Sequence, residues 1–147
     1  MARSPTRFVH QHLPYLLAQA SHVLWRGFEA EVRAAGLNSL EWRVLATLSD
    51  SPGLSVGQLA HEVLAKQPTL TKSLDRLAAQ GWVRRRADAA DARRARVELT
   101  AAGRRKVQPL LAAAERHQLA RLRDLGVDDA EALRQALRRL LVRTPPA

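Results

Sequence analysis

Short hydroxyl and cationic side chains recur at helical spacing near the middle of the chain. Four of them follow an i, i+3, i+4, i+7 pattern: Thr69, Lys72, Ser73 and Arg76. This spacing places them on one face of a helix, where hydroxyls and cations can bond phosphates and base edges. The helix N-terminus also favours phosphate. A solvated amphipathic helix has the same pattern, so this helix alone leaves both interpretations open.

The helix that precedes this face is predicted from its cap. Ser55 is a good N-cap residue, and Gln58 stands three residues later, where a capping box needs it. The apolar face of this first helix is formed by Leu59, Val63 and Leu64. A short turn, Ala65–Gln67, follows it. We therefore expect two helices joined by a tight turn.

The bounds and register of the second helix follow from three signals. Pro68 suits the first position of a helix. Gly81 suits a left-handed C-cap. The inward stripe has i, i+4, i+7 spacing and consists of Leu70, Leu74 and Leu77. With these leucines inside, the register predicts that the hydroxyls and cations face outward.

Two short strands joined by a basic loop follow the second helix. Residues 82–84 and 96–99 alternate apolar and polar side chains, which is the strand period. The segment between them contains ADAADARR, which has no apolar anchor. A β-hairpin with a charged, protruding tip is a wing.

Residues 66–106 carry 12 Lys or Arg against 4 Asp or Glu, which is +8 of the chain's +10. Such concentration indicates a polyanionic partner.

One motif in this stretch is specific. It reads D-x-R-x-x-x-V-x-L-T-x-x-G and comprises Asp91, Arg93, Val97, Leu99, Thr100 and Gly103. The chain resembles the MarR family of bacterial transcription regulators in this motif, in LTKSLDRLAAQGWVRR and in LNSLEWRVLATL. The resemblance covers almost the whole chain and is weakest in the first dozen residues. It implies a mainly α fold with a small β-hairpin wing, a winged helix–turn–helix.

The resemblance also implies residue roles. Arg93 would enter the DNA minor groove, and Asp91 would support the hairpin. This chain has Ala92 where many members carry a basic residue, so Arg94 and Arg96 remain alternatives for the groove. The major-groove contacts would come from Gln67, Thr69, Thr71, Lys72, Ser73 and Arg76. The partner would be a double-stranded, pseudo-palindromic operator with half-site centres about 10 base pairs apart, or a multiple of that.

The rest of the chain is predicted to support this lobe within a single MarR-like domain, residues 1–147. Residues 38–100 form the DNA-binding lobe, which begins with Asn38 as N-cap and Glu41 completing a capping box. Helices at about 13–35 and 104–143 carry long leucine-rich stripes, and Thr100 can cap the first helix after the wing. A homodimer would bury these stripes. An intramolecular three-helix bundle is the alternative.

The resembled family often binds a small aromatic or phenolic effector between the dimer helices and the reading head. The matching candidates here are Tyr15, His22, Arg26 and Trp42. His22 and Arg26 lie one turn apart, so an anion could use both while a ring stacks. The opposing interpretation makes Tyr15 and Trp42 packing residues and gives Arg26 a carboxylate partner.

Composition excludes several classes of function. No cysteine is present, so disulfides, cysteine metal sites and thiol oxidant sensing are excluded. We find no GxSxG, P-loop, HExxH or GxGxxG, and we expect neither an enzyme nor a cofactor. His10 and His12 without further ligands favour no metal site.

Two alternatives concern the partner and location. No secretory segment or apolar run of about 18 residues occurs, which favours a cytoplasmic protein without a membrane span. Membrane-surface binding would fit the basic charge less well, because the charge lies on a compact hairpin module. A winged-helix module that docks on an acidic protein partner remains the alternative to a DNA-binding regulator.

Overall fold

The computed structural model describes residues 7–142, apart from the side chains of Leu125 and Val127. It divides into two compact units, of which one is residues 28–113 and the other combines residues 7–27 with 114–142. Each unit is described by itself. Arg143, the predicted end of the last helix, lies outside the described residues.

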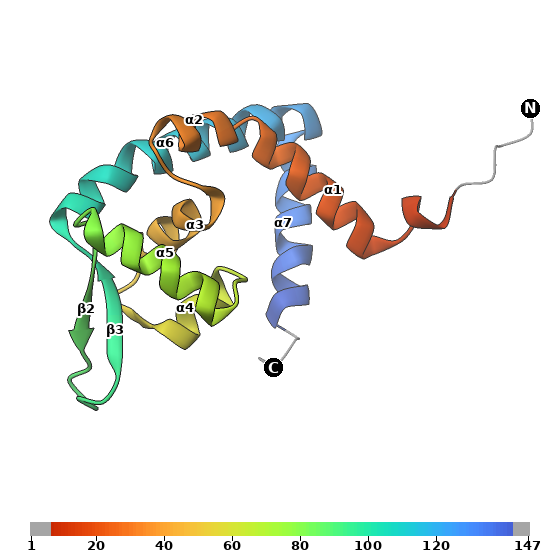
Figure 1. Cartoon of the computed structure of the whole chain (residues 1–147). Coiled ribbons are helices and arrows are strands. Elements are labelled where there is room, and N and C mark those ends of the chain that lie inside the picture. Colours follow the sequence, from red (N-terminus) through yellow and green to blue (C-terminus); the bar gives the residue numbers. More distant parts are fainter. Residues whose placement is uncertain (1–6, 143–147) are drawn as a thin grey trace, which may run out of the picture. The chain divides into compact units, whose positions relative to one another are not determined.

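The 28–113 unit is a winged helix, as the sequence predicts (Figure 1). Its sheet is antiparallel in the order β1-β3-β2, with Val83 opposite Leu99 and Leu54 opposite Val97. The two-residue strand β1 is too short for a sequence period to reveal. The elements are α2 (Glu29–Ala34), α3 (Ser39–Ser49), β1 (Leu54–Ser55), α4 (Val56–Glu62), α5 (Gln67–Ala79), β2 (Val83–Ala87), β3 (Ala95–Leu99) and the first half of α6 (Ala101–Leu125).

The predicted inward stripes form the core of this unit. The largest fully buried side chains are Leu45, Leu48, Leu59, Leu70, Leu74, Leu77, Val32, Val44, Val63, Val97 and Val107. They come from α2 to α6 and from β3, so the helices and the sheet share one core. Burial of a Val or Leu side chain stabilises the fold by about 1.5–3 kcal/mol.

Both predicted capping boxes are present. In α3 the amide of Glu41 donates to Asn38 Oδ1 at 2.9 Å, and the Asn38 amide donates to Glu41 Oε2 at 2.9 Å. In α4, Ser55 and Gln58 exchange the same two bonds at 3.1 and 3.0 Å. Each cap contributes about 1 kcal/mol and defines where its helix begins. Gly81, with φ of 77°, confirms the left-handed end of α5.

Leu64 departs from its predicted place on the apolar face of α4. Its side chain is 84% exposed, and its φ is 53°. Helix α4 ends at Glu62, and Leu64 turns the chain toward α5, so its side chain swings away from the core. The left-handed conformation costs a non-glycine residue about 1–2 kcal/mol. Helix α5 begins at Gln67, one residue before Pro68.

The second unit contains a 3-10 turn (Phe8–His10), α1 (Leu13–Arg26), the second half of α6 and α7 (Val127–Val142). The predicted helix over 13–35 is wrong as one element, because α1 ends at Arg26 and α2 begins at Glu29. Gly27 is a weak helix former. Phe28 is buried and packs edge-on against Trp42, with ring centroids 4.9 Å apart. The break therefore falls at Gly27 and Phe28, where the buried Phe28 side chain packs against the core of the 28–113 unit.

Large apolar side chains remain exposed on α1, α6 and α7. They are Leu13, Leu16, Val23, Leu24, Leu119, Leu133, Leu140, Leu141 and Val142. Within residues 7–142, none of the helices combines the length and apolar character that a membrane span requires.

A hydrogen-bonded corner centred on Thr100 joins α5, the wing and α6. The Thr100 hydroxyl donates to the Gly81 carbonyl at 2.5 Å and accepts from the Gly103 amide at 3.0 Å. The Thr100 amide donates to the Trp82 carbonyl at 3.1 Å. Gly103 is needed here because a Cβ at this position would lie 1.9 Å from the Trp82 carbonyl oxygen.

We expect Gly103→Ala to destabilise the protein by about 3 kcal/mol or more, because a methyl group cannot share this space with a backbone carbonyl. Thermal denaturation followed by circular dichroism measures the change. Gly57→Ala in α4 is the matched control, since its Cβ would meet only the Gln67 side-chain amide at 3.4 Å. Equal melting temperatures for Gly103→Ala and the wild type would contradict the packing account.

Candidate nucleic-acid interface

The outer face of α5 carries most of the predicted contact residues. Exposed side chains among them are Gln67, Thr69, Thr71, Lys72 and Arg76. Ser73 is an exception and is only 3% exposed, so its predicted outward position is wrong. It lies three residues after Leu70 and four before Leu77, which places it within the inward stripe.

An open hollow of about 680 Å³ lies along this face. Its lining consists of Pro68, Thr69, Lys72, Ser73, Asp75 and Arg76. Two cations, two hydroxyls and one carboxylate therefore border one concave surface along α5. Such a surface can bond the phosphates and base edges of a nucleic acid.

Ion pairs hold α5 on both flanks. Arg76 Nη2 lies 3.0 Å from Oε1 of Glu41 on α3, whose side chain is 8% exposed. On the other flank, Arg85 Nη2 lies 3.2 Å from Oδ1 of Asp75 and connects β2 to α5. No local spacing in the sequence signals either pair, because the partners are distant along the chain.

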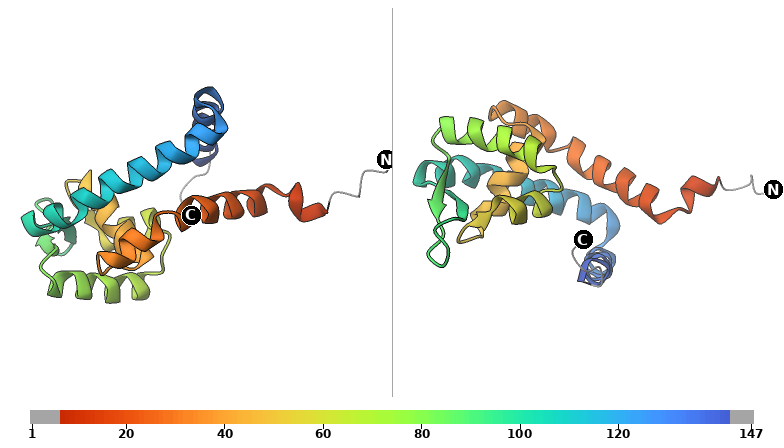
Figure 2. Two further views of the ribbon diagram at one scale, coloured as in Figure 1. Left: turned by 90° about the horizontal axis from the view of Figure 1, so that it is seen from above. Right: turned by 60° about the horizontal axis from the view of Figure 1, so that its bottom comes forward.

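Strands β2 and β3 leave the helices as a projecting hairpin (Figures 1 and 2). Two aspartates order its tip in place of an apolar anchor. Asp88 Oδ1 accepts from the Ala90 amide at 2.9 Å, and Asp91 Oδ1 accepts from the Arg93 amide at 3.0 Å. The loop is closed by the Asp88 amide, which donates to the Arg94 carbonyl at 2.8 Å.

The wing arginines differ in how firmly they are held. Arg96 donates from Nε to Asp88 Oδ2 at 2.8 Å and from Nη1 to the Gly53 carbonyl at 3.1 Å. It thus ties the wing to the segment before β1. Arg94 lies 3.7 Å from Asp91 Oδ2. Arg93 is exposed and has no ion pair within the described part of the chain.

The Arg96 guanidinium holds the pKa of Asp88 below its ordinary value by donating a hydrogen bond to the carboxylate. The Ala90 amide adds to this effect, and Arg94 contributes a smaller electrostatic part. A lowered pKa in the folded state stabilises the wing above the ordinary carboxyl pKa. That contribution is lost as the pH falls through the lowered value.

The effector candidates fall in both units. Tyr15, His22 and Arg26 lie on α1, where Tyr15 is half-buried with its ring 6.2 Å from that of His10. His22 and Arg26 are exposed. Trp42 lies on α3 in the 28–113 unit, where it packs on Phe28. Trp42 therefore has a packing role, as the opposing interpretation proposes.

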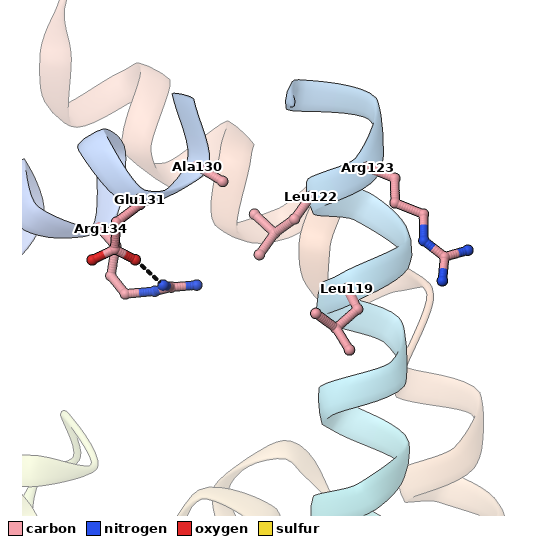
Figure 3. A pocket seen from close by; sticks show the side chains of 6 residues that line it. All are labelled: Leu119, Leu122, Arg123, Ala130, Glu131 and Arg134. Carbon is pink, nitrogen blue, oxygen red and sulfur yellow. Dashed lines mark hydrogen bonds and ion pairs between the residues drawn. The ribbon is translucent and has the colours of Figure 1, made fainter. Parts of the chain in front are cut away.

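A second hollow, of about 380 Å³, lies between α6 and α7 (Figure 3). Leu119 and Leu122 on α6 and Ala130 on α7 give it apolar walls. Arg123 and the ion-paired Glu131 and Arg134 complete its lining. No sequence pattern predicted this hollow, because it forms only when α6 and α7 pack together. Among the described residues there is no cluster of three or more His, Cys, Asp or Glu side chains that could hold a metal ion.

Comparisons with known proteins agree with this geometry. Residues 35–94 match the family model described as MarR family. The chain is 34% identical over 113 residues to the HTH-type transcriptional repressor Mb2911 of Mycobacterium bovis, covering 75% of this chain and 81% of the relative.

Solved structures extend the similarity to nearly the whole chain. The MarR family transcriptional regulator SPO1453 from Silicibacter pomeroyi is 38% identical, with a TM-score of 0.82 over 92% of this chain and 96% of the other. NadR in complex with 4-hydroxyphenylacetate is 25% identical, with a TM-score of 0.82 over 95% and 97% of the two chains.

We expect Arg96→Leu to raise the pKa of Asp88 toward its ordinary value, because it removes the strongest stabilising partner of the carboxylate. A carboxyl-carbon NMR titration measures this pKa. Arg94→Leu serves as the control and should raise the pKa of Asp88 less. An unchanged Asp88 pKa in Arg96→Leu would show that the pair does not hold the wing in solution.

Proposed function

The chain belongs to the MarR family of transcriptional regulators, and we propose that it is a homodimeric repressor that reads a pseudo-palindromic DNA operator. Each protomer would place α5 in the major groove and the tip of the wing in the flanking minor groove. The observation that carries this proposal is the joint presence of two features. The outer face of α5 exposes hydroxyls and cations, and Arg93 at the wing tip has no ion pair among the described residues.

Among the wing arginines, we assign the minor-groove contact to Arg93. Its backbone amide is fixed by Asp91, while its guanidinium has no ion pair within residues 7–142. A fixed backbone with a free cation suits the negative potential of a narrow minor groove. Arg94 is the second candidate. Arg96 is engaged by Asp88 and Gly53, and moving it would release two hydrogen bonds.

The homodimer is supported by the apolar side chains on α1, α6 and α7. Leu133 and Leu140 on α7 are each 49% exposed, and Leu119 on α6 is 50% exposed beside the hollow of Figure 3. Large apolar side chains exposed together on helices are typical of an association site. A two-fold axis would set the spacing of the two reading heads and thereby the spacing of the operator half-sites.

The effector class we propose is a small aromatic or phenolic acid. NadR, which has been solved with 4-hydroxyphenylacetate, supports this class. In this chain His22 and Arg26 are exposed one turn apart on α1, where both can meet a carboxylate. Tyr15, a half-buried aromatic side chain on the same helix, can contact a ring. Binding of such an acid would lower operator affinity.

The protein would act in the cytoplasm on DNA, without catalysing a reaction. The competing proposal is a module that docks its wing on an acidic protein. The salt dependence of DNA binding separates the two proposals. If the protein neutralises Z phosphates, the logarithm of its DNA-binding constant falls with the logarithm of the salt concentration with a slope near −0.9Z. A DNA-binding constant that does not change with salt favours the acidic protein partner.

Removing the free wing cation should weaken operator binding. We expect Arg93→Ala to cost roughly 1–3 kcal/mol in binding free energy, measured by fluorescence anisotropy on duplexes tiled across the upstream region of the gene. Arg33→Ala on α2 removes the same charge from an exposed pair with Glu29 and should bind normally. Unchanged affinity of Arg93→Ala at physiological salt would count against the wing assignment.

Charging the apolar stripe of α7 should separate the protomers. We expect the double variant Leu133→Glu, Leu140→Glu to sediment as a monomer and to lose most operator affinity, because half-sites would then bind independently. Gln135→Glu places one negative charge on α7 away from this stripe and should remain dimeric. A wild-type protein that sediments as a monomer at micromolar concentration would refute the homodimer.

A further inference from the structure

Arg76 forms a wall shared by two hollows and is held there by a buried carboxylate. One hollow lies along the outer face of α5, and the other, of about 420 Å³, is lined by residues that include Glu41, Gln80 and Trp82. We propose that Glu41 is a positioning residue for DNA recognition, which orients Arg76 so that its remaining N–H donors read a guanine in the major groove. This inference rests on the proposed DNA-binding function.

Glu41 is rigid and uses both of its oxygens. Its residue is 6% exposed, in the first turn of α3. Oε2 accepts from the Asn38 amide at 2.9 Å, and Oε1 meets Arg76 Nη2 at 3.0 Å. The capping box fixes one oxygen, so the other is presented to Arg76 at a defined place. The Glu41 carboxylate can therefore hold the Arg76 guanidinium in one orientation.

The contact with Glu41 leaves some of the Arg76 N–H donors available. The Arg76 side chain is 63% exposed, and its contact with Glu41 uses one terminal nitrogen. A guanidinium carries five N–H donors in a planar fork, so donors remain for another partner. They border the same hollow as Thr69 and Lys72, on the face that we assign to the major groove.

A held guanidinium recognises guanine better than a free one. Guanine presents O6 and N7 as two adjacent acceptors, and an arginine fork matches both. A free arginine loses rotamer entropy when it makes these bonds, whereas the Glu41 pair has already restricted Arg76. Arg76 can therefore supply specificity as well as charge. A lysine would retain the charge but not the fork.

Simple electrostatics predicts the opposite effect for Glu41. A carboxylate near a polyanion repels it, so removing this charge should strengthen binding to any duplex. A positioning role predicts weaker discrimination instead. The two effects can thus be separated by comparing affinities for specific and non-specific DNA rather than by measuring one affinity.

The test begins with selection of duplexes from a random library by the wild-type protein. We expect a G·C pair in each half-site that Glu41→Gln no longer selects, while the other selected positions are retained. Glutamine preserves the capping box because its side-chain oxygen can still accept from Asn38. Anisotropy then compares the selected duplex with one carrying A·T at that pair and with a scrambled duplex.

For Glu41→Gln we expect discrimination at that pair to fall roughly tenfold or more, with equal or tighter binding to the scrambled duplex. Arg76→Lys should lose discrimination at the same pair, and the double variant should lose no more than either single variant. Glu62→Gln is the control. It removes an exposed charge on α4 that has no ion pair among the described residues, and it should leave discrimination unchanged.

Unchanged base preference in folded Glu41→Gln would overturn the inference, as would an additive double variant. Melting temperatures identify loss of folding. If Glu41→Gln unfolds, Arg76→Lys, which leaves Glu41 intact, still overturns the inference by retaining discrimination at the selected pair. If the wild-type protein selects no sequence at all, the proposed DNA-binding function fails, and this inference fails with it.

Discussion

The arrangement of α5, the wing and α6 depends on the hydrogen-bonded corner at Thr100. One hydroxyl binds the Gly81 carbonyl at the end of α5 and the Gly103 amide at the start of α6. The chain passes so close to the Trp82 carbonyl that only glycine fits at position 103. In the D-x-R-x-x-x-V-x-L-T-x-x-G motif, the second half, which ends with Thr100 and Gly103, is therefore mainly structural. The first half, Asp91 and Arg93, lies at the exposed wing tip.

The positive charge of the lobe is divided between structural and free arginines. Arg84, Arg85 and Arg96 each meet a carboxylate within 3.2 Å and hold the strands to one another or to α5. Lys106 likewise donates to the Ala35 carbonyl and lies 4.7 Å over the Trp82 ring. An excess of cations therefore overstates the number that are free to contact a polyanion, because several of these cations hold the lobe together.

Local signals predicted most of the fold. Asn38 and Ser55 capped the expected helices, and Gly81 ended α5, because these effects involve neighbours in the chain. Ser73 was predicted to face outward because it lies four residues after Thr69 on the polar face of α5. It also lies three residues after the buried Leu70, and tertiary packing places it on that inward face. The ion pairs of Glu41 and Asp88 join residues 35 and 8 positions apart (76 − 41 and 96 − 88), which no helical or strand period reports.

The most direct test of the account is hydroxyl-radical footprinting of the operator duplex, because the radical attacks sugars through the minor groove. We predict two protected minor-groove segments, placed symmetrically about the operator centre, that disappear in Arg93→Ala while the protein stays bound at high concentration. Protection that persists unchanged without Arg93, or that shows no two-fold symmetry, would contradict the proposal that paired wings flank the major-groove contacts of α5.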